Sequence, residues 1–288
     1  MEIKNILRKK LEAEVLMYER NLKNLDEATF NSILNRWADD SVFYEIDRYN
    51  NILRIEPNLK TKKILDIASG CGSFVIQGLL NGYNTYGIEP SDWKQDLIDL
   101  KFKKNNYNPE WRKRILKGVG ENLPFEDNSF DVINSWQTIE HVQDLKVCVF
   151  EMYRVLKPGG KAVLQGPNYF CFHEGHYRMF WFPLLKPNSK FAKFYVGKIR
   201  KRPLEGLETF NVVNAYTLRK FCKQAGFKVV NIKKIIIKQA LVKHLPITKH
   251  KVFMPLHFLA YYLWDFYFWI KKLGMGQRTI NFLLIKKL

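Results

Sequence analysis

Two acidic residues and a run of small residues stand where apolar stretches end in the first half of the chain. The segment KKILDIASGCGSF carries Asp66 and then a loop containing Ala68, Gly70 and Gly72. Residues without bulky side chains let the backbone pass close to a ligand and adopt unusual φ/ψ values. Glu89 ends the next apolar run, YGIEPS, where a carboxylate can accept both hydroxyl groups of a ribose. The loop therefore has the shape of a ligand-binding loop, and its residue types alone do not specify the ligand.

The spacing of the small residues argues against a dinucleotide. The Rossmann fingerprint GxGxxG needs a third small residue so that the helix can pack on the strand. Here Gly70 and Gly72 are followed by serine, phenylalanine and valine, so the third glycine is missing. The spacing that fits the chain is D-x-A-x-G-x-G, which calls for a different ligand.

The elements that would position these residues alternate between strands and helices. Short β-rich runs, KKILDIA, NTYGIEP, RILKG, FDVINS and KAVLQG, are separated by helical stretches, which is typical of a parallel sheet with helices on both faces. The helix EMYRVLKPGG ends in a Lys-Pro-Gly-Gly stop, and NAYTLRKFCKQAGF begins with Asn214 as its N-cap and closes at Gly226. The late runs FKVVNIKKIIIK and NFLLIKKL fit an antiparallel hairpin at the sheet edge.

We therefore expect an α/β fold, a Rossmann-like doubly wound sheet of seven strands that is mostly parallel with an antiparallel final hairpin. Residues 1–60 are expected to form an N-terminal helical segment, a lid or packing element, and residues 61–288 the main domain. Two stretches depart from the alternation, a substrate-side insertion at 168–213 and an aromatic, basic helical insertion at 240–276. Substrate specificity often resides in such excursions.

Five segments, met in order along the chain, resemble the class I S-adenosylmethionine-dependent methyltransferases. D-x-A-x-G-x-G is similar to the first motif of that family, and Glu89 to the acidic residue after its second strand. GVGENLPFEDNSFDVI resembles the loop that borders adenine, SWQTIEHVQD the segment after the fourth strand, and RVLKPGGKAVL the helix, stop and strand before the substrate region. The resemblance covers residues 62–238 and the terminal strand, and is closest to the methyltransferase type 11 subgroup that includes quinone-biosynthetic enzymes.

The resemblance implies that the loop holds S-adenosyl-L-methionine. Asp66 would orient the loop or the methionine amino group. Ala68, Gly70 and Gly72 would bring backbone near the methionine moiety, and Glu89 would hold the ribose.

The later segments would complete the cofactor site. By the same resemblance, Gly120 and Glu121 would border the adenine, and Trp136 or Gln137 would close over the methionine end, although Trp136 could equally be a core aromatic. Quinone-type relatives carry an E-x-x-E-H pattern associated with a divalent metal. This chain reads Q-T-I-E-H there and lacks the first carboxylate, so we expect no metal.

Three histidines are candidates for catalysis. The family chemistry is an in-line displacement at a methyl carbon, and a hydroxyl acceptor would also need a general base within reach. His173 and His176 lie where relatives face the acceptor, beside Arg178, which could hold an anionic group. They could equally be polar residues of a loop packed by its aromatic neighbours. His141 is a further candidate, with the alternative that it only holds its own loop.

Charge divides the chain in two. From Met1 to Glu174 there are 24 Lys and Arg against 25 Asp and Glu, whereas Gly175 to Leu288 carries 23 against 3. The second half should present a positive field toward nucleic acid, an anionic membrane or an anionic substrate. Val252 to Ile270 holds nine Phe, Tyr or Trp and is flanked by lysines, which fits an interfacial helix at an anionic membrane or a buried helix over the active site. The basic, aromatic segment Lys190 to Pro203 fits nucleic-acid binding or a solvated basic face.

We expect a methyltransferase that acts on a small-molecule, lipid-like, lipid-linked or saccharide acceptor, more often at oxygen than at carbon or nitrogen. An RNA methyltransferase and a non-catalytic protein that binds S-adenosylmethionine are the alternatives. The four cysteines form no CxxC pair and the start of the chain has no secretory apolar run. We therefore expect a cytoplasmic protein, peripheral at the inner face of the membrane.

Overall fold

The computed structural model describes residues 3–10, 27–38, 43–232 and 279–288, except positions 171, 173, 175, 176, 178, 184, 203 and 209. Residues 3–10 are helical. The other helices are α2 Glu27–Ala38, α3 Phe43–Leu53, α4 Ser73–Leu80, α5 Asp92–Asn105, α6 Pro109–Arg112, α7 Leu145–Val155, α8 Lys190–Phe194 and α9 Ala215–Ala225, with short turns at η2 Leu59–Thr61, η3 Tyr195–Ile199 and η4 Glu205–Glu208. The strands are β1 Lys63–Ile67, β2 Asn84–Ile88, β3 Ile115–Leu116, β4 Phe130–Trp136, β5 Leu156–Pro167, β6 Phe227–Asn231 and β7 Thr279–Lys286.

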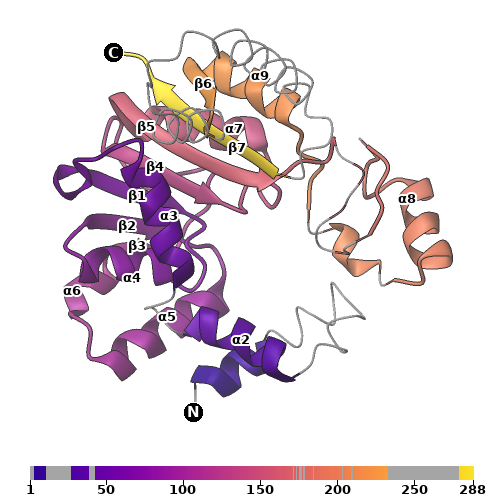
Figure 1. Ribbon diagram of the computed structural model, residues 1–288, viewed down its shortest axis with the longest axis horizontal. Coiled ribbons are helices and arrows are strands. Elements are labelled where there is room, and N and C mark those ends of the chain that lie inside the picture. Colours follow the sequence, from indigo (N-terminus) through magenta and orange to yellow (C-terminus); the bar gives the residue numbers. More distant parts are fainter. Residues whose placement is uncertain are drawn as a thin grey trace, which may run out of the picture.

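These strands form one twisted sheet of seven, in the order β3-β2-β1-β4-β5-β7-β6 (Figure 1). The pairs from β3 to β5 are parallel, and β7 is antiparallel to both β5 and β6. The predicted doubly wound sheet with an antiparallel end is therefore confirmed. The chain order reverses beside β1, and ligands of open α/β sheets bind at such a point, outside the carboxyl ends of the strands.

Alternating side chains of the strands build a core on each face of the sheet. Leu65 of β1 packs with residues of α7 and α9, including Cys148 and Cys222. Its neighbour Ile64 points the other way and packs with Tyr49 of α3. Because successive side chains of a strand face opposite sides, one short apolar run supports both helical layers. The N-terminal segment thus contributes α3 to the main core.

One predicted boundary was placed differently from the structure. The sequence EMYRVLKPGG predicts that its helix stops at Lys-Pro-Gly-Gly and that the strand begins after it, whereas α7 ends at Val155 and β5, beginning at Leu156, already includes the stop. The pairing of β5 with β4 shifts register, since Phe130 pairs with Leu156 and Val132 with Lys161. Pro158 cannot continue a helix and Gly159 has a φ of 74°, so this stretch makes an irregular start to the strand.

Helix α9 begins and ends where its sequence predicts. Asn214 accepts a hydrogen bond from Thr217 N at 2.8 Å, and Gly226 closes α9 with a φ of 105°. The predicted insertion at 240–276 and the aromatic stretch 252–270 lie outside the described residues. Among the residues that are described, no helix has both the length and the apolar character needed to cross a membrane.

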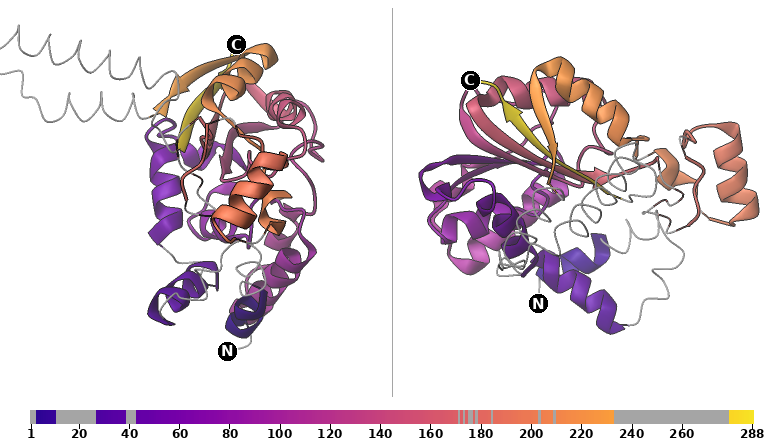
Figure 2. Two further views of the ribbon diagram at one scale, coloured as in Figure 1. Left: turned by 90° about the vertical axis from the view of Figure 1, so that its right-hand side faces the viewer. Right: turned by 45° about the horizontal axis from the view of Figure 1, so that its top comes forward.

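The stretch after β5 has a small core of its own. Tyr169, Tyr177, Trp181 and Phe210 are buried together in it. The buried carboxylate of Glu174 accepts hydrogen bonds from Tyr169 Oη and Tyr177 N. In Figure 1 and in the right-hand view of Figure 2, α8 stands apart from the sheet beyond the end of β5.

Candidate active site

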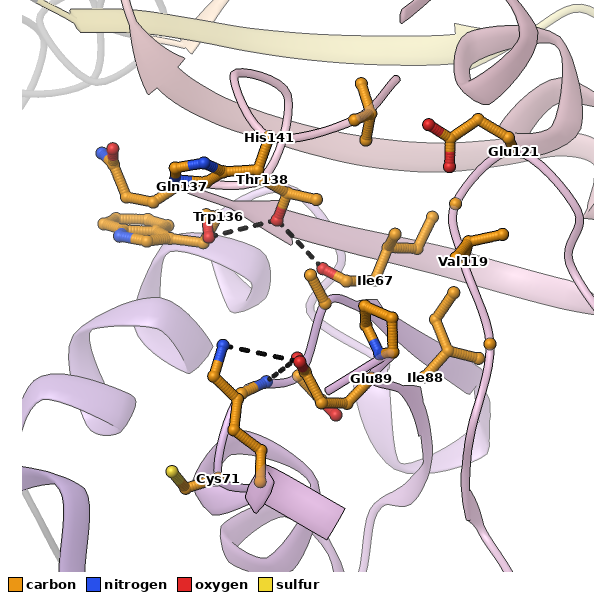
Figure 3. Close-up of a pocket in the computed structure, with 18 of the residues that line it drawn as sticks. Ile67, Cys71, Ile88, Glu89, Val119, Glu121, Trp136, Gln137, Thr138 and His141 are labelled. Carbon is orange, nitrogen blue, oxygen red and sulfur yellow. Dashed lines mark hydrogen bonds and ion pairs between the residues drawn. The ribbon is translucent and has the colours of Figure 1, made fainter. Parts of the chain in front are cut away.

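A cavity of about 1090 Å³ lies at the carboxyl ends of β1, β2 and β4. Most of the residues predicted to bind the cofactor line it, as does His141; they are Ala68, Gly70, Glu89, Gly120, Glu121, Trp136 and Gln137 (Figure 3). Asp66 and Gly72 lie behind the wall and do not line the cavity. His173 and His176 lie outside the described residues.

The loop after β1 contains residues whose backbone adopts the left-handed conformation. Ala68 and Gly70 both have a φ of 58°, a region that glycine tolerates and alanine adopts at a cost. Gly72 is the N-cap of α4, and a Cβ there would lie 3.1 Å from Ile115 Cδ1. The third small residue of the motif thus lets the start of α4 pack closely against β3.

A buried lysine supports this loop from below. Lys101 of α5 is fully buried, and its Nζ donates to Cys71 O and to Ser73 Oγ, each at 3.0 Å. Sequence reasoning missed Lys101 because its partners lie 28 and 30 residues earlier in the chain.

Glu89 is held at the cavity wall by backbone donors. Its side chain is almost fully buried, with Oε2 accepting from Gly70 N at 2.9 Å and Oε1 from Ser91 N at 3.2 Å. Lys94 Nζ lies 3.4 Å from Oε1 (Figure 3). Two carboxylate oxygens offer about four acceptor positions, so this arrangement leaves capacity for ligand hydroxyls.

Asp66 lies beside an arginine that the sequence analysis did not single out. Asp66 is fully buried and accepts from Asn134 Nδ2 at 2.6 Å. Arg48 Nη2 of α3 lies 3.6 Å from Asp66 Oδ1, and the Arg48 guanidinium sits over the Trp136 ring at 5.5 Å. Arg48 also lines the cavity, so the N-terminal segment brings a positive charge to the site.

The segment after β3 comes close to the sheet at Gly120. A Cβ at Gly120 would lie 2.8 Å from Cys148 Sγ, so only glycine fits there. Burial raises the pKa of the Cys148 thiol, which stays neutral. Glu121 Oε1 accepts from Gln143 N at 2.5 Å and from Asp144 N at 3.3 Å, which ties this loop to the segment after β4.

Trp136, Gln137 and His141 form the opposite wall. Gln137 has a φ of 53°, and the adjacent Thr138 Oγ1 lies 3.1 Å from Ile67 O (Figure 3). His141 Nε2 lies 3.9 Å from Oε1 of the buried Glu140, and the imidazole is 41% exposed toward the cavity. The two side chains are thus close, at a distance longer than a direct hydrogen bond.

Arg154 braces the loop that leads to β4. Its guanidinium donates to Leu123 O, Phe125 O and Asp127 at 2.8 to 3.0 Å, and to both carboxylate oxygens of Glu151. We expect Arg154→Gln to lower the free energy of unfolding by roughly 2 kcal/mol. The two carbonyl oxygens and the two carboxylates that Arg154 contacts would lose their charged donor. Urea unfolding measures this change.

The matched control is another i,i+3 ion pair. Lys113 and Glu110 are 72% and 70% exposed, so Lys113→Gln should cost less than about 0.5 kcal/mol. The hydrogen bonds from Arg154 lower the pKa of the Glu151 carboxyl. Its stabilising contribution is therefore complete above the unfolded pKa of about 4.3 and is lost as the pH falls through the lower folded pKa. Equal losses in the two variants would contradict the bracing role.

Comparison with known proteins shows to which family the chain belongs. The methyltransferase domain family model matches residues 42–232. The chain is 28% identical over 206 residues to the demethylmenaquinone methyltransferase of Staphylococcus haemolyticus (strain JCSC1435), covering 65% of this chain and 82% of that protein. It is 26% identical over 175 residues to the demethylmenaquinone methyltransferase of Geobacillus sp. (strain WCH70), covering 54% and 74%.

Solved structures show the same fold. Phosphoethanolamine N-methyltransferase 2 of Haemonchus contortus, in complex with S-adenosyl-L-methionine, superposes with a TM-score of 0.50 at 19% identity. That match covers 84% of this chain and 52% of the other, so the chain spans about half the length of that protein. The PH0226 protein of Pyrococcus horikoshii OT3 superposes with a TM-score of 0.50 at 15% identity, covering 90% and 99%.

The matched residues 42–232 include the loop after β1, Glu89 and most of the residues that line the cavity. The chain belongs to the methyltransferase domain family and is a class I S-adenosylmethionine-dependent methyltransferase.

Proposed function

We propose that this enzyme transfers the methyl group of S-adenosyl-L-methionine to an oxygen of a small, lipid-like or lipid-linked acceptor. The cavity carries the proposal. Its volume of about 1090 Å³ exceeds the roughly 300–1,000 Å³ that a single drug-sized ligand occupies, which leaves room for an acceptor beside the cofactor. Trp37, Val142 and Val147 give part of its lining an apolar character. The demethylmenaquinone methyltransferases, whose name specifies a quinone substrate, support an acceptor of this kind.

The proposed cofactor pose follows from the cavity walls. Glu89 accepts the ribose hydroxyls, and Gly120 and Glu121 border the adenine. Trp136 and Gln137 lie at the methionine end, where Arg48 offers a positive charge to the methionine carboxylate. The loop of Ala68 and Gly70 runs beneath this end.

In the proposed reaction an electron pair of the acceptor oxygen forms the new bond to the methyl carbon while the carbon–sulfur bond breaks. The electrons of that bond stay on sulfur, which gives S-adenosylhomocysteine. The hydroxyl proton passes to a base, for which we propose His141, oriented by Glu140. Holding the two reactants in line contributes up to about 7–11 kcal/mol to lowering the barrier.

We also propose that the enzyme works in the cytoplasm at the inner face of the membrane. The described cysteines Cys71, Cys148 and Cys222 are free thiols in buried positions, which suits a reducing compartment. The excess of basic residues after Gly175 suits an anionic lipid surface.

Labelled cofactor tests the acceptor class. Purified enzyme is incubated with cell extract and S-adenosylmethionine that carries an isotopically labelled methyl group, and the products are separated into lipid, polysaccharide, RNA and small-molecule fractions. Label is expected in the lipid or small-molecule fraction, in a bond that resists acid as an ether does. Label confined to RNA would contradict the proposal and favour an RNA methyltransferase, which the basic second half would also suit. A heat-inactivated sample is the control for non-enzymatic transfer.

A further inference from the structure

The insertion after β5 exposes a set of large aromatic side chains. Phe172, Phe180, Phe191 and Phe194 are 58%, 46%, 50% and 54% exposed, and Phe182 is 39% exposed. Folded proteins tolerate single exposed apolar residues, but a contiguous group of this kind marks an interaction site. These five phenylalanines are called the aromatic surface below.

The rings of the aromatic surface form a continuous chain. Phe172 stacks on Phe180 with centroids 5.6 Å apart, and Phe180 meets Phe182 edge-on at 5.1 Å. Phe182 in turn contacts Phe191 at 5.5 Å. Phe194 lies three residues after Phe191, on the same side of α8. Helix α8 buries Ala192 in the small core and exposes Phe191 and Phe194 to solvent. It therefore has apolar residues on its outer side as well as on its inner side.

Positive charge surrounds these rings. Between Gly175 and Leu204 the sequence holds eight Lys or Arg and no Asp or Glu. Lys190 and Lys193 of α8 and Lys198 of η3 are exposed. The surface therefore combines an apolar centre with basic side chains around it. A face that only had to stay solvated would be polar and would not need exposed phenylalanines.

We propose that the aromatic surface, with its surrounding lysines, docks the enzyme on a bilayer containing anionic lipids. Phenylalanine rings enter the boundary between headgroups and acyl chains, and lysines beside them meet the lipid phosphates. Single-stranded nucleic acid fits less well, because bases need open ring faces on which to stack. Here ring faces are already covered by other rings: Phe172 stacks on Phe180, and Phe182 meets Phe180 and Phe191 at 88° and 63°.

The position of this surface agrees with such an arrangement. The insertion follows β5 at its carboxyl end (Figure 1). The cavity lies at the carboxyl ends of β1, β2 and β4. In a parallel sheet these ends share one edge. Docking through the insertion would hold the cavity beside the bilayer, where a lipid-like acceptor is found. The inference deepens the proposed function and relies on it only for this last step.

Vesicle binding by the full chain tests the surface. Wild-type protein is expected to sediment with vesicles of phosphatidylcholine and phosphatidylglycerol at low salt, and only weakly with phosphatidylcholine alone. Phe191→Gln/Phe194→Gln should weaken binding at least about 10-fold, since glutamine keeps the helix but removes the apolar contact. Lys193→Gln/Lys198→Gln should weaken it about 30-fold, and added salt should shrink that difference.

Matched variants on the rest of the surface control for general effects. Leu80 and Phe150 are 49% and 41% exposed on other helices, so Leu80→Gln/Phe150→Gln should leave vesicle binding unchanged. Lys103→Gln/Lys104→Gln removes the same charge as the lysine pair above, from the end of α5, and should change binding less than about threefold.

Several outcomes would overturn the docking surface. The first is that the wild type does not bind anionic vesicles. The second is that both surface variants bind as the wild type does. The third is that only deletion of residues 252–270 abolishes vesicle binding. A dimer that the Phe191→Gln/Phe194→Gln change dissociates would assign the surface to a second copy of the chain, and RNA binding without vesicle binding would assign it to nucleic acid. Labelled-methyl transfer is measured on the same preparations. Vesicle binding without transfer to lipid would leave the surface intact and count against the proposed acceptor.

Discussion

Glu89→Gln is expected to weaken binding of S-adenosylmethionine by about 100-fold or more. Each hydrogen bond to a charged group contributes roughly 1.5–3 kcal/mol, and two ribose hydroxyls would donate to this carboxylate. Glutamine has the same size, but its amide nitrogen cannot accept, so it opposes either a ribose hydroxyl or the Gly70 N–H that lies 2.9 Å from the carboxylate. Titration calorimetry of the purified variant with the cofactor measures the change.

The control for this prediction is a glutamate without a place in the site. Glu110→Gln alters an exposed side chain of α6 and should leave cofactor affinity within about twofold. Thermal unfolding without cofactor should show that the Glu89→Gln variant is folded. An affinity within threefold of wild type in that folded variant would remove Glu89 from the ribose site.

Arg48→Met should lower the free energy of unfolding by about 3–5 kcal/mol. Asp66 is fully buried and accepts a hydrogen bond from Asn134, and removal of the arginine 3.6 Å away takes a positive charge from its desolvated carboxylate. Breaking a buried pair costs far more than replacing both partners, because the desolvated charge persists. Urea denaturation followed by circular dichroism measures the loss, and cofactor affinity should fall as well.

A second substitution distinguishes two causes of the stability loss, the broken ion pair and the lost packing of the Arg48 side chain. Asp66→Asn in the Arg48→Met background removes the stranded charge and should restore a large part of the lost stability. Arg54→Met, on an exposed arginine just after α3, should change stability by less than about 0.5 kcal/mol. If the double variant is no more stable than Arg48→Met alone, the loss comes from packing against Phe74 and Trp136 rather than from Asp66.

Local patterns in the sequence were sufficient to predict the sheet and most of the cavity wall. Every predicted strand run that lies within the described residues contains a strand, because apolar runs flanked by turn residues have few other stable arrangements. Glu89 and the loop around Gly70 could be predicted because they directly follow strands, and parallel strands share one carboxyl edge. Asn214 and Gly226 act within one helix, where the interactions are local.

The residues that sequence reasoning missed depend on contacts between distant segments. Arg48 reaches the site from α3, and nothing in FYEIDRYNNIL distinguishes it from a solvated arginine. Lys101 resembles its exposed neighbours Lys103 and Lys104, and only the packing of α5 under the loop buries it. Asp66 lies behind the wall because side chains alternate along β1, which the motif spacing alone does not reveal.

The place of β7 has a consequence for the order in which the protein can be made. β7 lies between β5 and β6, so β6 gains its sheet partner only when residues 279–286 have been synthesised. Strands β1 to β5, which include the three whose ends line the cavity, are complete once residue 167 has left the ribosome. Domains fold as the chain emerges, N-terminal parts first, and distant pairings form late. The cofactor half of the sheet can therefore assemble during translation, while the far edge has to wait for the final strand.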